Sequence, residues 1–232
     1  MSFISSAAVM KYILASFLAI SLLSGCGSIY SPTLNLPHEP LAKNQGQLTG
    51  TLSALPQQGL GDLGAAASGE GQISYGFSDR FSLQLKAWSQ LSELSQYQYN
   101  GGTSLAGTYL ISSKDASLPL ALIATSSMLI DGRTIKANGG SLQLAAWLPE
   151  FGIFRPYIGL GAGILAADFK TQDWGYGGII NAGTSIKFSD NIQINFELFG
   201  LLQQYIKYHS LSGFLAPSLS VSLRFDNSQG SH

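Results

Sequence analysis

Few residues of this chain have the types and spacing that covalent or acid–base chemistry requires. His209 and Ser210 place a general base beside a hydroxyl nucleophile. Adjacent residues on a strand point to opposite faces, however, and no acidic residue is evident that would orient the imidazole. His38 and Glu39 are also adjacent, but no further metal ligands lie near them in the sequence. We therefore expect no catalytic site, no metal site and no cofactor, and we do not expect an enzyme.

Charged side chains within alternating segments are the next candidates. Glu70, Lys86, Glu197 and Arg224 share the polar face of segments that alternate between polar and apolar residues. A lysine or arginine that faced lipid at the bilayer midplane would cost roughly 2–4 kcal/mol. We therefore predict that all four face the inside of a membrane barrel as a structural charge network. The alternative is that they line a path for an ion or solute.

Cys26 is the only cysteine of the chain, which excludes an intramolecular disulfide. Before it, Lys11 is followed by a mostly apolar stretch over residues 12–23 and then by Ser24 and Gly25. A positive charge, an apolar core too short to span a membrane and small residues together predict a secretory signal peptide over residues 1–25. The signal begins at either Met1 or Met10.

The tetrapeptide Leu23-Ser24-Gly25-Cys26 resembles the lipobox of bacterial lipoproteins. The resemblance implies cleavage before Cys26, a diacylglyceryl group on its thiol and often a further acyl chain on its new amine. Gly27, where an aspartate would retain a lipoprotein in the inner membrane, implies delivery to the outer membrane. Residues 26–44 include three prolines and are predicted to be an extended tether. The alternative is a lone buried cysteine behind an uncleaved hydrophobic anchor.

The overall composition favours a membrane barrel over residues 45–226, followed by a short tail over residues 227–232. Charged residues make up 11% of the 232 residues, against about 25% in an ordinary soluble domain. No internal apolar run is long enough for a transmembrane helix, whereas the outer face of a barrel meets lipid along alternating strands. A soluble lipocalin-like barrel, the main alternative fold, would carry charges on its exterior. The formal net charge of −1 provides no basic face for nucleic acid.

Period-two alternation predicts an all-β, antiparallel up-and-down transmembrane barrel of about ten strands, with eight as the alternative. A hairpin centred on Ser78 would pair Glu70 with Lys86, Gln72 with Gln84 and Ser74 with Ser82. The fifth segment does not alternate clearly, so its register stays open. The ten predicted segments cover residues 45–54, 64–76, 80–91, 101–112, 118–129, 139–149, 156–168, 176–188, 191–203 and 214–226.

Connections after the even-numbered segments are short, and those after the odd-numbered segments are mostly longer, such as residues 92–100, 130–138 and 204–213. Short periplasmic turns and longer external loops are typical of outer-membrane barrels, so we expect both termini in the periplasm. Trp88 and Trp147 lie on the polar face of their segments and are expected to help fill the lumen, with positions in the girdles as the alternative. Aromatic residues near segment ends predict interfacial girdles, with Tyr75, Phe81, Tyr109, Phe154, Tyr157, Phe188 and Phe225 at the periplasmic end and Tyr97, Tyr99, Phe169, Trp174, Tyr176, Tyr205 and Phe214 at the other.

Two stretches resemble known outer-membrane barrels. Pro156-Tyr157-Ile158-Gly159-Leu160-Gly161-Ala162-Gly163 is similar to a glycine-rich strand of small OmpA-like barrels. The stretch Leu223-Arg224-Phe225 resembles the C-terminal signal of these proteins, although seven residues follow it. The resemblances imply an OmpA-like outer-membrane lipoprotein whose partners are membrane lipid, the lipoprotein-processing machinery and the barrel-assembly machinery. The omptin-like proteases use an Asp-x-His pair that this chain lacks, since Lys207 precedes His209 by two residues.

Three functions remain open at this stage. The first is a structural or surface-interaction barrel whose external partner the sequence does not name. The second is a narrow channel or small-ligand carrier, because the inward faces are polar. The third is a membrane enzyme, which ranks last because no catalytic set is found. Ten strands lie close to the size at which side chains fill a barrel, so a wide diffusion pore is not expected.

Overall fold

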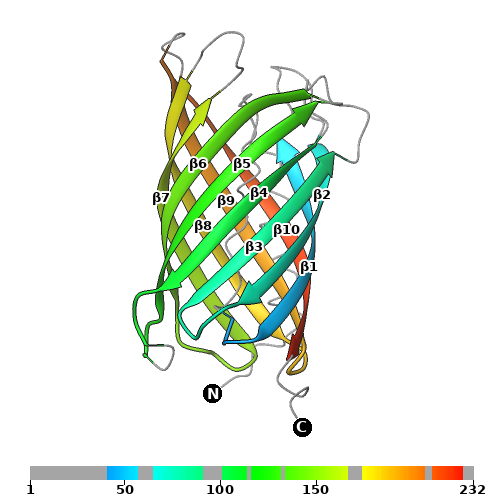
Figure 1. Ribbon diagram of the computed structural model, residues 1–232, viewed down its shortest axis with the longest axis vertical. Coiled ribbons are helices and arrows are strands. Elements are labelled where there is room, and N and C mark those ends of the chain that lie inside the picture. Colours follow the sequence, from blue (N-terminus) through cyan, green and yellow to red (C-terminus); the bar gives the residue numbers. More distant parts are fainter. Residues whose placement is uncertain are drawn as a thin grey trace, which may run out of the picture.

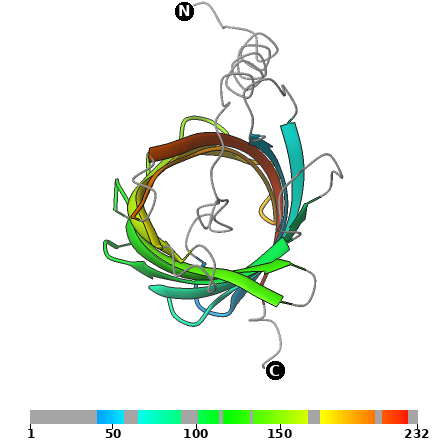
Figure 2. The same ribbon diagram turned by 90° about the horizontal axis from the view of Figure 1, so that it is seen from above.

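The computed structural model describes residues 41–56, 65–90, 101–113, 116–131, 134–166, 174–206 and 211–226. These residues form one closed antiparallel barrel in which each strand pairs with its neighbours in sequence and β1 pairs with β10 (Figure 1). Seen along its axis, the barrel is a continuous ring of strands (Figure 2). The strands are β1 (Gln45–Pro56), β2 (Ala65–Gly76), β3 (Phe81–Gln90), β4 (Gly101–Leu110), β5 (Leu120–Asp131), β6 (Thr134–Trp147), β7 (Phe154–Ala166), β8 (Trp174–Lys187), β9 (Ile192–Tyr205) and β10 (Leu211–Asp226).

The predicted fold class is confirmed, including the number and order of the strands. Among the described residues, no helix has the length and apolarity to cross a membrane. Gln45 at the start of β1 pairs with Asp226 at the end of β10, so both ends of the barrel domain lie at the same rim. The short connections β2–β3, β4–β5, β6–β7 and β8–β9 lie at this rim too, which we call the turn end.

Strand alternation sorts side chains between the lumen and the outer surface as predicted. On β2 and β3, Glu70, Gln72 and Lys86 are buried, whereas Ile73 and Leu85 are each 57% exposed. Similar exposed residues encircle the barrel, so water would meet a continuous apolar band. A bilayer removes this cost because the band then faces hydrocarbon. Its members include Leu48, Leu52, Leu105, Leu122, Leu142, Leu144, Leu160, Ile180, Leu202, Leu219, Val221 and Leu223.

The predicted register of the β2–β3 hairpin is wrong by two residues. Glu70 lies opposite Trp88, and Lys86 lies opposite Gln72. The hairpin is centred on Asp79, because the amide of Phe77 donates to the carbonyl of Phe81 across a turn of three residues. A shift of two residues leaves every side chain on its predicted face, since alternation has a period of two. The shift therefore changes which residues pair across the hairpin, but not which side chains face the lumen.

The first half of β5 is apolar on both faces, which explains why its sequence did not alternate. Ala121 and Ile123 are buried in the lumen, while Leu122 and Met128 are exposed on the outside. The inward pair joins a cluster of buried residues from β4 to β7, made of Ala106, Leu110, Ala121, Ile123, Ala145, Trp147 and Tyr157. One side of the lumen is therefore apolar. The expectation of polar inward faces applies mainly to the opposite side, along β1 to β3 and β8 to β10.

The predicted bounds of two loops are also corrected. Residues 130, 131 and 134–138 belong to strands and not to a loop, because Ile130 pairs with Ile135 and Asp131 with Thr134, beyond a register shift at Leu129. That irregularity interrupts the alternation, so the sequence pattern did not predict where the two strands end. Likewise, β9 and β10 extend into the predicted loop 204–213.

Tyr157 is not an interfacial residue, since it points into the lumen and is only 4% exposed. Phe81, Tyr109, Phe188 and Phe225 do lie exposed near the turn end, whereas Tyr97, Tyr99 and Phe169 lie outside the described residues.

Candidate functional site

The first polar site in the lumen is an ion pair between neighbouring strands. The Nζ atom of Lys86 lies 3.2 Å from Oε2 of Glu70, and the two side chains are 6% and 2% exposed. Ser53 on β1 donates its hydroxyl to the other carboxylate oxygen of Glu70 at 3.2 Å. The long side chains meet diagonally, since their backbones are two positions out of register. Buried charges are stable only with such partners, so the site ties β1, β2 and β3 together.

The second polar site links β7, β8 and β9 around Glu197. The Tyr157 hydroxyl donates to Oε2 of Glu197 at 2.9 Å, and the Asn181 amide donates to Oε1 at 3.1 Å. Tyr157 and Glu197 lie two strands apart, with Gly183 between them in the same row. A Cβ atom at Gly183 would come within 2.5 Å of the phenol ring and its oxygen. The glycine therefore lets the Tyr157 side chain cross β8 and reach the carboxylate.

Arg224 lies closer to the turn end than the other predicted lumen charges. Its Nε atom donates to Oε1 of Gln47 on β1 at 3.2 Å, and the side chain is half-buried. The structure thus brings Glu70 and Lys86 together. It places Glu197 among groups of β7 and β8, and Arg224 beside β1. All four point inward, but they occupy three places in the lumen.

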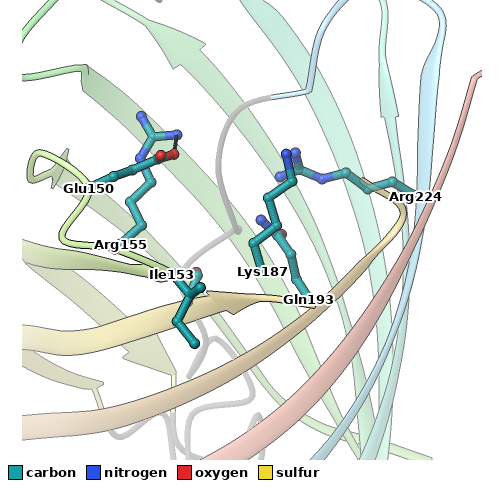
Figure 3. Close-up of a pocket in the computed structure, with 8 residues that line it drawn as sticks. Glu150, Ile153, Arg155, Lys187, Gln193 and Arg224 are labelled. Carbon is teal, nitrogen blue, oxygen red and sulfur yellow. Dashed lines mark ion pairs between the residues drawn. The ribbon is translucent and has the colours of Figure 1, made fainter. Parts of the chain in front are cut away.

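A cavity of about 320 Å³ opens at the turn end beside Arg224. Three cationic side chains line it, Arg155 from β7, Lys187 from β8 and Arg224 from β10, together with the carboxylate of Glu150 and the amide of Gln193 (Figure 3). Neither Arg155 nor Lys187 was predicted from the sequence as a site residue. Strand alternation indicates that Arg155 faces the lumen, because it lies two residues before the inward Tyr157. Alternation indicates the same for Lys187, which lies two residues after the buried Ser185.

The turn between β6 and β7 positions Glu150 and Arg155 at this cavity. Phe151 and Phe154 exchange backbone hydrogen bonds of 2.8 and 3.1 Å across Gly152 and Ile153. Gly152 has a φ of 64°, a left-handed value that glycine adopts without strain. Glycine at the first of two central residues is the pattern of a type II′ turn, whose twist matches the flanking strands. The turn is therefore tight enough to hold both charged residues at the cavity.

The last residues of the predicted tether form a turn against the β2–β3 hairpin. The Asn44 amide donates to the carbonyl of Gly76 at 2.8 Å, and the Lys43 amide donates to Oδ1 of Asp79 at 3.2 Å. Leu41, at the start of this segment, is only 4% exposed. The chain therefore reaches β1 along the turn end of the barrel.

Several predicted residues lie outside the described part of the chain. They are Leu23, Ser24, Gly25, Cys26, His38, Glu39, Lys207, His209 and Ser210. Within the described residues, no three histidine, cysteine, aspartate or glutamate side chains are grouped as metal ligands would be.

No protein-family model matches the chain, and no curated protein sequence matches it. Among solved structures, the chain is similar to the N-terminal β-barrel domain of OprF from Pseudomonas aeruginosa, with 15% identity over 80% of this chain and 100% of that one, at a TM-score of 0.37. An outer membrane channel from Pseudomonas putida F1 has 11% identity over 86% and 100% of the two chains, at a TM-score of 0.49. The outer membrane protease OmpT from Escherichia coli has 8% identity over 79% and 94%, at a TM-score of 0.42.

The class of protein follows from the chain's own geometry. It is a closed ten-stranded antiparallel barrel with an apolar outer band and short turns at the rim where its two ends meet. This combination defines a small β-barrel of the outer-membrane type.

Proposed function

We propose that the protein is a lipid-anchored barrel of the outer membrane with a structural or surface-interaction role. The observation that carries the proposal is a lumen filled by its own side chains. Trp147 and Phe199 are each 1% exposed, and Trp88 is 6% exposed, so the predicted filling by both tryptophans is confirmed. A barrel filled in this way is suited to spanning the membrane and presenting its far rim, and is poorly suited to wide diffusion.

The position of the N-terminal segment supports a lipid anchor at Cys26. Leu41 to Asn44 lie at the turn end, where periplasmic turns are expected. A tether from the inner leaflet of the outer membrane would deliver the chain to this rim. We propose that the lipoprotein-processing machinery acts at Cys26 and that the barrel-assembly machinery recognises the end of β10. Both termini are then periplasmic, and nucleic acid is not a partner.

The proposal includes no catalytic role. In the described part of the chain, the buried carboxylates of Glu70 and Glu197 accept hydrogen bonds from Ser53, Tyr157 and Asn181. Such contacts hold a carboxylate in place rather than prepare it to exchange a proton with a substrate. These contacts support a structural reading of the lumen.

A narrow channel is the second candidate, favoured by the polar side of the lumen. Residues from β1, β2, β9 and β10 line this side with small hydroxyls and amides, including Thr49, Thr51, Ser68, Gln72, Gln193, Asn195, Ser218, Ser220 and Ser222. Hydrogen bonds connect several of them, such as Thr49 to Ser222 at 3.0 Å. These contacts support a packed wall, and a channel would require that wall to open.

Two measurements test the proposal. Metabolic labelling with palmitate should label the wild-type chain and leave Cys26→Ala unlabelled, while a Ser24→Ala control keeps its label; a labelled Cys26→Ala chain would refute the anchor. In planar bilayers the purified barrel should show no steady conductance. Reproducible single-channel steps that Lys86→Met alters would refute the filled lumen and establish the channel instead.

A further inference from the structure

The chain makes a tight turn immediately before it enters the barrel. Residues Leu41–Gln45, which we call the strap, end at the first residue of β1. The Gln45 amide donates to the Ala42 carbonyl at 3.1 Å, and Asn44 has a φ of 66°. A positive φ at the third of four residues is the pattern of a type II turn, and asparagine tolerates this left-handed conformation. The strap therefore has a defined backbone shape.

The backbone amides of the strap are held by hydrogen bonds. Each of its last four residues donates one. These bonds run from Ala42 to Oε1 of Gln45 at 2.9 Å, from Lys43 to Oδ1 of Asp79 at 3.2 Å, from Asn44 to the carbonyl of Gly76 at 2.8 Å and from Gln45 to the carbonyl of Ala42 at 3.1 Å. Two of the four reach the β2–β3 hairpin, so the strap is fixed to the barrel as well as to itself.

The strap packs against the inner face of β2. Gly76 lies two residues after Ser74, which is buried in the lumen, so Gly76 faces inward too. A Cβ atom at Gly76 would collide with the carbonyl group of Ala42 and would lie 3.2 Å from the Cβ atom of Leu41. Leu41 is only 4% exposed. The glycine therefore provides the room in which the strap crosses the inner edge of the barrel mouth.

We propose that the strap fixes the N-terminal side of the chain to the barrel mouth and shields the peptide bond after Lys43 from proteases. The Lys43 side chain is exposed, so burial does not hide it from a trypsin-like enzyme. Cleavage requires local opening, because the bonded amides and the left-handed Asn44 keep this segment from becoming extended. The strap does not depend on the proposed function. The consequence that it keeps a lipid anchor joined to the barrel does rest on that function.

Limited digestion of the folded full chain with trypsin in neutral detergent tests the proposal. Sequencing of the product that begins at Asn44 detects the cut. We expect the wild type to be cut after Lys43 far more slowly than the heat-unfolded chain. Gly76→Ala should speed this cut about tenfold or more, because the added methyl group displaces Ala42 and raises the population of the open form. Gly71→Ala is the matched control on the same strand, since it faces outward into open space and should behave as the wild type.

A second pair of variants tests the turn itself. Asn44→Val should speed the cut about tenfold, because a β-branched residue is strained at a left-handed φ. Asn44→Gly should stay within about threefold of the wild type, since glycine adopts this conformation freely and only an exposed hydrogen bond from Tyr75 is lost. Cys26→Ala should be protected as well as the wild type is. This last comparison separates failure of the strap from failure of the anchor.

Three results would overturn the proposal. The first is a wild-type chain that is cut after Lys43 as fast as the unfolded chain. The second is a wild-type rate of cutting in both Gly76→Ala and Asn44→Val. The third is equal acceleration by Gly71→Ala and Gly76→Ala, which would indicate general loosening of β2. Lys86 is buried in the lumen, so absence of a cut after it shows that the barrel of a variant is intact. If Gly76→Ala fails this check, the comparison of Asn44→Val with Asn44→Gly decides.

Discussion

The buried pair of Glu70 and Lys86 yields the sharpest prediction about stability. In Lys86→Met the methionine fills similar space, but it leaves the Glu70 carboxylate in the lumen without its cation. Removing one partner of a buried ion pair generally costs about 3–5 kcal/mol. Ser53 still donates a hydrogen bond to Glu70 at 3.2 Å, so we expect the lower end, a loss of about 3 kcal/mol in the free energy of unfolding.

Two further variants separate the effect of burying an ion pair from the effect of the distance between its charges. The double variant Glu70→Gln with Lys86→Met removes both charges and should fall within about 1 kcal/mol of the wild type. Lys187→Met breaks an ion pair that is shorter, 3.0 Å against 3.2 Å, but exposed. Its cost should be about 0.5 kcal/mol or less, because water screens the charges that remain.

The assay is urea-induced unfolding in lipid vesicles, followed by tryptophan fluorescence. Trp88 lies opposite Glu70 on the neighbouring strand and reports on this part of the lumen. A single variant Lys86→Met as stable as Lys187→Met would refute the buried pair. A double variant no more stable than Lys86→Met would show that lost packing, and not the unpaired charge, is responsible.

Four further substitutions, with Leu85→Ala as a reference, test the outer face and the lumen. Leu85→Lys, on the exposed apolar band, should lower stability in bilayers by roughly 2–4 kcal/mol, more than Leu85→Ala does; equal effects would argue against contact with lipid. Trp147→Ala should cost about 3–5 kcal/mol in the same unfolding assay because the side chain is 1% exposed, and a loss below about 1 kcal/mol would mean that the lumen is not packed there. Tyr157→Phe should lower the free energy of unfolding by about 1.5 kcal/mol, because it removes the hydrogen bond to Glu197. Gly183→Ala should lower it by about 1–3 kcal/mol, because the added methyl group displaces the phenol ring. Wild-type stability in both variants would contradict the contact between Tyr157 and Glu197.

The sequence predicted the faces of the barrel better than its contacts. Ile73 and Leu85 were assigned to the outside, and Glu70 and Lys86 to the lumen, because alternation depends only on local pleating. The partner of Glu70 was wrong, since turns of different length are compatible with the same alternation. Only the backbone hydrogen bonds of the turn at Ser78 to Arg80 decide the register.

Contacts between strands that are not adjacent in the barrel could not be predicted from the sequence. Tyr157 was assigned to an interfacial girdle because it lies near a strand end, yet it points into the lumen and reaches Glu197, two strands away, across Gly183. Similarly, Arg155 and Lys187 line one cavity with Arg224 because the registers of β7 to β10 bring their ends to one rim. Side-chain parity could have placed each residue inward, but no local pattern predicts that three strands share one cavity.

The central claim, a closed barrel that spans the outer membrane, is tested most directly by gel mobility. The outer-membrane fraction is run in sodium dodecyl sulfate with and without boiling. A closed ten-stranded barrel should resist the detergent until heated and should therefore migrate as two different bands. A single mobility under both conditions, with Cys26→Ala released as a soluble chain, would contradict the claim and place the β domain in the periplasm.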